Sequence, residues 1–155
     1  MKYDLRIYVL LVGISPLRIY VYKDGLARFA TEKYEKPNDK NVDNIYMHLT
    51  NYAINKENEN FVKNRDKNND DVGSKRSLQS VLDGIELECG SEKMEEMQHK
   101  IYDIFIKCLT LTVPSVGHLV KSCQPEDIEN QMCFEVFGFD IMIDQKLTPY
   151  LLEVN

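Results

Sequence analysis

Two segments near the carboxyl end carry side chains suited to binding a hard cation. In the run Phe139–Ile143, strand alternation places Asp140 on the face opposite the apolar residues. In the strand predicted to follow, Glu153 and Asn155 share one face. If residues 145–148 form a four-residue loop between the two strands, Asp140 lies directly opposite Glu153.

Two facing carboxylates with a carboxamide beside them repel one another and are costly to desolvate unless a positive group lies between them. Oxygen ligands without His or Cys suit Mg²⁺, which binds one or two carboxylates and keeps its other sites for water and phosphates. A solvent-facing strand with ordinary charges is the alternative, and it is the better interpretation for a single carboxylate. Three matched ligands favour the metal, so Asp140, Glu153 and Asn155 are the predicted magnesium ligands.

Polar groups in two other segments are open to two interpretations. Lys2, Asp4 and Arg6 extend along one strand face, where cations can neutralise phosphate oxygens, but a surface ion pair worth ~0–1 kcal/mol explains them equally well. The segment His48-Leu49-Thr50-Asn51 follows an apolar stretch, and by itself it is best interpreted as a strand end whose polar side chains satisfy nearby backbone groups.

The elements that position these residues follow from periodicity. Strands are predicted over 5–12, 17–22 and 26–30, with a hairpin at Asp24-Gly25 because both residues tolerate positive φ. The polar stretch Asn55–Lys75 is predicted to be a mobile loop within one domain. Apolar spacing of three and four then predicts two amphipathic helices, over 78–85 and from Ser91 to 108, and the stretch 133–155 returns to strand character.

Composition excludes several classes of function. The 155 residues suit one domain, and a net charge of −6 disfavours a general nucleic-acid binder, although residues 1–36 are +3 and the remainder −9. The longest apolar run, Ile7–Val12, is far short of the ~20 residues that cross a bilayer, so no membrane is expected and a soluble intracellular protein is predicted. Cysteines without C-x-x-C spacing and scattered histidines argue against a zinc site.

Five runs, taken in order, resemble the tubulin tyrosine ligase-like family, and in particular its glutamylating branch: Lys2–Leu10, Leu17–Tyr20, Gly25–Ala30, His48–Tyr52, and Phe137–Asp140 with Leu151–Asn155. The resemblance spans nearly the whole chain. It implies an α+β, ATP-grasp-like fold with a mostly antiparallel sheet and packed helices. Residues 1–155 would be the central and C-terminal part of that catalytic domain, with the upstream nucleotide-binding lobe missing, so the isolated segment is expected to bind ATP poorly and to be inactive.

The resemblance also implies roles for individual residues. Arg6 and Arg28 match catalytic positions that face the γ-phosphate or acyl phosphate, and Arg18 is either a further substrate contact or a solvated strand residue. The positions that match the nucleotide site are Lys2, Asp4, His48, Thr50 and Asn51, and those that match the magnesium ligands are Asp140, Glu153 and Asn155.

The implied reaction uses ATP and Mg²⁺ to convert a carboxylate of a tubulin tail to an acyl phosphate, which the amine of a free amino acid, glutamate, then attacks. Alternatives are a ligase of the same family that adds tyrosine or glycine, or a non-catalytic microtubule-binding module that uses the basic strands of residues 1–36. A protein kinase is disfavoured because the His-Arg-Asp and Asp-Phe-Gly motifs are absent. The expected location is the cytoplasm and microtubule cytoskeleton, with the cilium or basal body as a further expectation.

Overall fold

A five-stranded antiparallel sheet, in the order β3-β2-β1-β4-β5, forms the centre of the fold. The computed structural model describes residues 1–64, 73–128 and 132–155. The strands are β1 (Tyr3–Ile14), β2 (Leu17–Phe29), β3 (Lys75–Ser77), β4 (Glu135–Ile143) and β5 (Pro149–Val154). The helices are α1 (Ile45–His48), α2 (Tyr52–Asn55), α3 (Leu78–Cys89) and α4 (Ser91–Cys123). The predicted α+β class with a mostly antiparallel sheet is confirmed.

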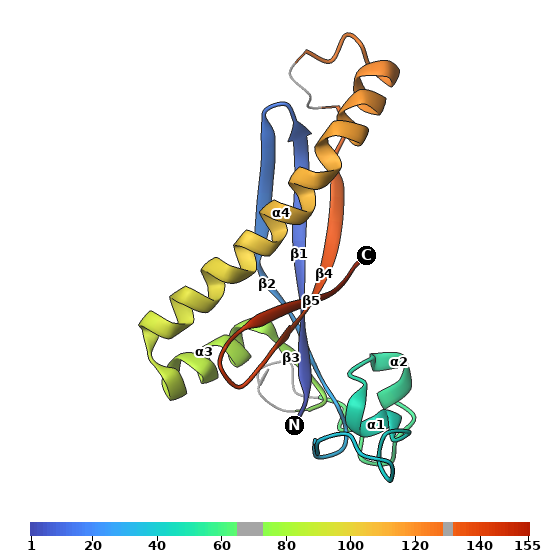
Figure 1. Ribbon diagram of the computed structural model, residues 1–155, viewed down its shortest axis with the longest axis vertical. Coiled ribbons are helices and arrows are strands. Elements are labelled where there is room, and N and C mark those ends of the chain that lie inside the picture. The colour runs from blue at the N-terminus through green and yellow to red at the C-terminus, as the bar shows by residue number, and fades with distance from the viewer. Residues whose placement is uncertain (65–72, 129–131) are drawn as a thin grey trace.

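Helices α3 and α4 cover one face of the sheet, and α1 and α2 lie at the end of the sheet where β1 begins (Figure 1). Alternation along β1 explains which side chains face these helices, because Leu5, Ile7 and Val9 are buried in the apolar core. The intervening residues Asp4 and Arg6 therefore lie on the opposite face. The predicted polar series on the first strand is thus separated from the apolar core by the sheet itself.

Both predicted helices are present, and α4 extends well beyond its predicted length, through Pro114. Its amino-terminal half supplies Met94, Met97, Ile101 and Phe105 to the core. By length and composition alone α4 is long and apolar enough to cross a membrane. Only 11% of its most apolar 18-residue window is buried within the protein. Its length and composition are weak evidence for a membrane span, because a helix that packs on a soluble core meets the same test.

The hairpin predicted at Asp24-Gly25 is wrong. Strand β2 runs without interruption through both residues and pairs with β1 along its length, Ile7 facing Gly25 and Val9 facing Val21. Three β2 residues therefore stand opposite one β1 residue, which makes a β-bulge. Position 25 requires glycine for a reason other than a turn. A Cβ there would lie 2.4 Å from the main-chain oxygen of Arg6, so no larger residue fits between the strands.

The stretch predicted as a loop, 55–75, begins and ends inside regular elements. Asn55 is the last residue of α2, and its side chain is only 1% exposed. At the other end, Lys75 begins β3, which pairs with β2. Residues 56–64 and 73–74 are neither helix nor strand, as the prediction expected, and residues 65–72 lie outside the described residues.

Candidate functional site

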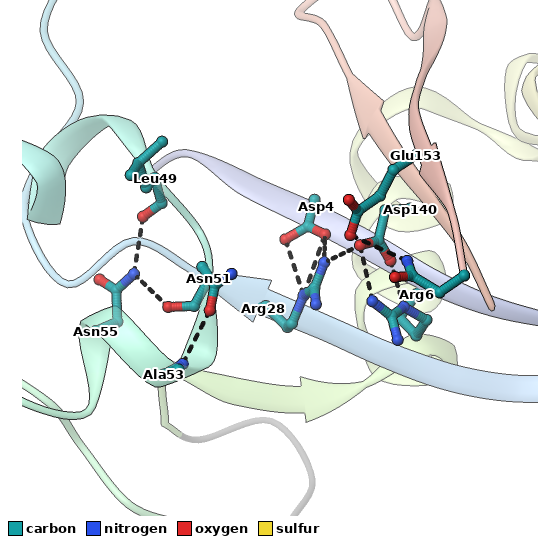
Figure 2. Close-up of polar contacts among 10 residues, drawn as sticks. Asp4, Arg6, Arg28, Leu49, Asn51, Ala53, Asn55, Asp140 and Glu153 are labelled. Atoms are coloured by element: carbon teal, nitrogen blue, oxygen red, sulfur yellow. Dashed lines mark hydrogen bonds and ion pairs between the residues drawn. The ribbon is translucent and has the colours of Figure 1, made fainter.

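Strand register brings the predicted charged residues together on the face of the sheet opposite α3 and α4. Asp4 of β1 is paired with Arg28 of β2, and Arg6 of β1 is paired with Asp140 of β4. Asp140 in turn is paired with Glu153 of β5, as the sequence predicted. Figure 2 shows these five side chains side by side across four strands. We call Asp4, Arg6, Arg28 and Asp140 the charge cluster.

Ion pairs fix both arginines of the charge cluster. The guanidinium of Arg6 donates through Nε and Nη2 to the two carboxylate oxygens of Asp140, the second bond measuring 2.8 Å. Arg28 donates through Nε to Asp4, at 3.2 Å from Oδ1 and 3.1 Å from Oδ2, and its Nη2 contacts both Asp4 and Asp140, the latter at 2.7 Å. Bidentate contacts of this kind hold a guanidinium in one orientation.

Burial and charge together set the protonation of this cluster. Burial alone would raise the pKa of Asp140, but hydrogen bonds from Arg6 and Arg28 outweigh it and hold that pKa below its usual value. Burial would lower the pKa of Arg28, whereas its hydrogen bonds to Asp4 and Asp140 raise it well above the ordinary value. The carboxylate of Asp140 and the guanidinium of Arg28 are therefore both charged at neutral pH.

The predicted pairing of Asp140 with Glu153 is confirmed, but the register between them and the turn differs from the prediction. Ile143, not Asp144, faces Pro149, so the connection is one residue longer than expected. Asp144 Oδ1 closes this connection by accepting from the amides of Lys146 and Thr148, each at 2.8 Å. A register shift between Asp140 and Ile141 then restores the alignment of the two carboxylates.

The three predicted magnesium ligands supply a set of oxygen donors in adjoining positions. The Nδ2 group of Asn155 donates to Glu153 Oε1 at 3.0 Å, so these two side chains touch, and Glu153 stands beside Asp140. A carboxylate has about four acceptor positions, more than the three arginine contacts made to Asp140. Hard oxygen donors of this type fit Mg²⁺. Among the described residues no three His, Cys, Asp or Glu side chains gather as a metal site, so this set depends on the Asn155 amide.

The predicted nucleotide residues lie at the end of the sheet where β1 begins. The Nζ group of Lys2 donates to the main-chain oxygen of His48 at 2.6 Å, which ties the first residues of the chain to the segment His48–Asn51. Thr50 is 8% exposed, and Asn51 Oδ1 accepts from the amide of Ala53 at 3.0 Å. The Nδ1 atom of His48 is buried without a hydrogen-bond partner in the described part of the chain, and an orphaned polar atom fits a site that takes a polar ligand.

The interpretation of His48–Asn51 as a strand end is wrong, because these residues end α1 and lead into α2. Two asparagines explain the helical turns: the side chain of Asn44 accepts from the amide of Tyr46, and that of Asn51 caps α2. The capping residues Asn44 and Asn51 were the only sequence signal for these two helices. Each helix is a single turn, so it shows no apolar periodicity.

Sequence reasoning also missed Asn55, which was assigned to the polar loop. Its side chain is buried and bonds to Thr31. It also bonds to the main chain of Leu49 and Asn51 (Figure 2). We call Thr31, Leu49, Asn51 and Asn55 the amide cluster. Composition could not single out Asn55, because it begins a long polar stretch and differs from the other residues of that stretch only in its tertiary contacts.

Comparison with known proteins identifies the family to which the chain belongs. Residues 1–155 match the tubulin-tyrosine ligase family along their whole length. The chain is 50% identical over 155 residues to a Tetrahymena thermophila protein named probable beta-tubulin polyglutamylase, covering 100% of this chain and 13% of that protein. It is 48% identical over 154 residues to human tubulin polyglutamylase TTLL6 (99% and 16% covered) and 43% identical over 156 residues to TTLL7 of Xenopus tropicalis (99% and 17%). The chain thus spans less than a fifth of the length of these relatives. The matches confirm the resemblance drawn from its motifs, and the chain belongs to the tubulin-tyrosine ligase family.

Proposed function

We propose that this chain is part of the catalytic domain of an ATP-dependent ligase that adds glutamate to glutamate side chains in tubulin tails. The observation that carries the proposal is the charge cluster, in which two arginines are held side by side by Asp4 and Asp140 next to Glu153. The names of the relatives supply the reaction: those reported above are tubulin polyglutamylases, at 43% to 50% identity.

Joining two carboxylate-bearing molecules requires activation of one carboxylate and neutralisation of several negative charges. ATP supplies the phosphoryl group that activates the acceptor, and Mg²⁺ supplies positive charge beside the phosphates. In our proposal Asp140, Glu153 and Asn155 hold the Mg²⁺, and Lys2, Asp4, His48, Thr50 and Asn51 line the nucleotide site. The guanidinium groups of Arg6 and Arg28 face the charge that develops during transfer.

The ion pairs of the charge cluster support this role for the arginines. Arg28 is 17% exposed and lies over Asp4, which is fully buried, so one edge of its guanidinium is fixed inside the protein. Arg6 is 21% exposed and is held in the same manner by Asp140. Donors that are oriented before the reaction need no reorganisation when charge develops, which is the main source of electrostatic catalysis.

The substrate assignment leads to expectations for partners and location. A tubulin ligase acts on the C-terminal tails of tubulin, takes free glutamate as its second substrate, and works in the cytoplasm on microtubules, including those of cilia and basal bodies. Neither nucleic acid nor membrane is part of this proposal.

Donor choice separates glutamate ligation from ligation of tyrosine or glycine by the same site. Full-length protein is incubated with polymerised tubulin, ATP, Mg²⁺ and one radiolabelled amino acid at a time. Label is expected to enter tubulin from glutamate. Incorporation from glycine or tyrosine alone would refute the donor assignment while leaving the ligase assignment in place.

Substitutions in the proposed metal set separate an enzyme from a microtubule-binding module. Asp140→Asn and Glu153→Gln are expected to lower glutamate incorporation by at least about a hundredfold, while co-sedimentation with microtubules persists. The matched control is Glu135→Gln, an exposed carboxylate on the same strand β4, which should leave incorporation unchanged. A protein that co-sediments but shows no incorporation even as the wild type would be a binding module instead.

A further inference from the structure

We propose that Asn55 is a positioning residue for the nucleotide side of this site, and that it holds the main chain of Leu49–Asn51 at a fixed place against the end of β2. The inference rests on the proposed function, because it gives Thr50 and Asn51 a role in binding ATP. Asn55 itself is 1% exposed and buried beneath that segment, so it acts through its neighbours.

The side chain of Asn55 uses all of its polar atoms in the amide cluster. Its Oδ1 accepts from the amide and from the hydroxyl of Thr31, each at 2.9 Å. Its Nδ2 donates to the main-chain oxygen of Leu49 at 2.8 Å and to that of Asn51 at 3.1 Å. The two carbonyls belong to the residues on either side of Thr50, so one amide group holds the main chain before and after it.

A short carboxamide is the side chain that suits this position. It must accept from two donors on one side and donate to two carbonyls on the other, which neither a carboxylate nor a hydroxyl of the same reach achieves. Aspartate would keep the oxygen that faces Thr31 but would turn a second oxygen toward two carbonyl oxygens. Asn55→Asp therefore breaks selectively the arm that holds Leu49 and Asn51.

These bonds close a ring that joins the nucleotide segment to the charge cluster. The amide of Ala30 donates to the main-chain oxygen of Lys2 at 2.9 Å, and Lys2 Nζ donates to the oxygen of His48. Thr31, the next residue after Ala30, is bonded to Asn55, which returns to Leu49 and Asn51. Because Arg28 lies three residues before Thr31 on the same chain, movement of Asn55 would shift the nucleotide segment relative to that arginine.

The same helical segment has a second attachment that does not involve Asn55. Glu32 accepts from Asn44 Nδ2 at 2.7 Å and from Asn58 Nδ2 at 3.2 Å, and its amide donates to the main-chain oxygen of Tyr46 at 3.1 Å. These contacts lie before α1, within α1 and after α2. Loss of the Asn55 bonds should therefore displace residues 49–51 without detaching the segment from the protein.

The test compares Asn55→Asp with Asn60→Asp in the full-length protein. Asn60 is exposed and undergoes the same chemical change five residues away. We expect Asn55→Asp to raise the KM for ATP about tenfold and to leave the KM for glutamate within about twofold of wild type, because one nucleotide-facing segment moves while the arginines stay in place. Asn60→Asp should change neither constant. Thr31→Val, which removes one of the four bonds, should raise the KM for ATP by a smaller factor.

A second measurement does not depend on activity. Amide hydrogen exchange across residues 49–56 should quicken in Asn55→Asp and stay at the wild-type rate in Asn60→Asp.

Equal rises in both KM values, or an unchanged KM for ATP in a folded Asn55→Asp protein, would overturn the proposal. If Asn55→Asp fails to fold, an unchanged KM for ATP in Thr31→Val overturns it instead. A wild-type protein that incorporates no amino acid would refute the proposed function, and unchanged exchange in Asn55→Asp would still refute the positioning role on its own.

Discussion

The charge cluster and the amide cluster lie next to each other but are built on different principles. In the charge cluster, regular strands place ionised side chains of β1, β2 and β4 opposite one another, and the side chains bind each other. In the amide cluster, a neutral side chain binds the main chain of an irregular segment. Period-two alternation places Asp4, Arg6 and Asp140 on the polar faces of their strands from the sequence alone. No local pattern of this kind marks Asn55, whose position is set by its tertiary contacts.

The largest effect on stability is expected from removing the guanidinium that covers Asp4. Arg28→Ala leaves a fully buried carboxylate whose side-chain hydrogen bonds, within the described residues, all come from Arg28. We expect the free energy of unfolding to fall by about 3 kcal/mol, measured by urea denaturation. Lys33→Ala, at an exposed position two residues beyond Thr31, should change it by less than about 0.5 kcal/mol. Equal losses in both variants would mean that the ion pairs contribute nothing specific.

A smaller loss is expected when the amide cluster is broken. Asn55→Ala removes the side-chain partner of the Thr31 amide and of the Leu49 main-chain oxygen, while the Asn51 oxygen keeps its bond from the main-chain amide of residue 55. The free energy of unfolding should fall by about 2 kcal/mol in urea denaturation, since a neutral buried group costs less to leave unpaired than a charge. Asn60→Ala is the exposed control. A loss as large as that of Arg28→Ala would contradict the distinction between the two clusters.

The close approach of Gly25 to the main chain of Arg6 gives a third, more moderate test. In Gly25→Ala the added Cβ meets the main-chain oxygen of Arg6 at 2.4 Å, so the strands must separate. We expect a loss of about 1.5 kcal/mol in thermal or urea unfolding. At Gly84 in α3 a Cβ would have nothing within 4 Å, so Gly84→Ala should instead stabilise the protein by about 0.5 kcal/mol. Similar losses in the two variants would argue against close strand contact at position 25.

The smallest predicted effect is a dependence on pH that belongs to the charge cluster and not to the amide cluster. The pKa of Asp140 is held low by Arg6 and Arg28 against the effect of burial. Its contribution to stability is therefore complete above the unfolded-state pKa of about 4 and is lost as the pH falls through the lower folded value. Between pH 7 and pH 3, Asp140→Asn should lose about 1 kcal/mol less stability than wild type, in urea denaturation at each pH. Asn55→Ala should keep the wild-type slope, and a shallower slope there would contradict the assignment.

Alternation in β1 and β4 predicted which residues share a face of the sheet and the pairing of Asp140 with Glu153, although a register shift is needed to produce that pairing. Arg28 was singled out only by the family resemblance, and the ion pairs of the charge cluster were not predicted. Sequence reasoning failed where tertiary contacts decide. Asp24-Gly25 has the composition of a turn, yet the chain continues along β1 and the glycine serves a close main-chain approach. Asn55 lies in a stretch with the composition of a loop, yet its side chain is buried and joins two segments of the chain. The single-turn helices α1 and α2 are too short for a periodic signal.

The central claim is that β4 and β5 hold a nucleotide-bound cation next to the charge cluster. It is tested most directly by crystallising the full-length protein with Mn²⁺ and a non-hydrolysable ATP analogue and locating the cation from its anomalous scattering. We predict a cation bonded to carboxylate oxygens of Asp140 and Glu153, with the Asn155 amide oxygen beside it. A cation bound to the nucleotide but away from both carboxylates would contradict the account.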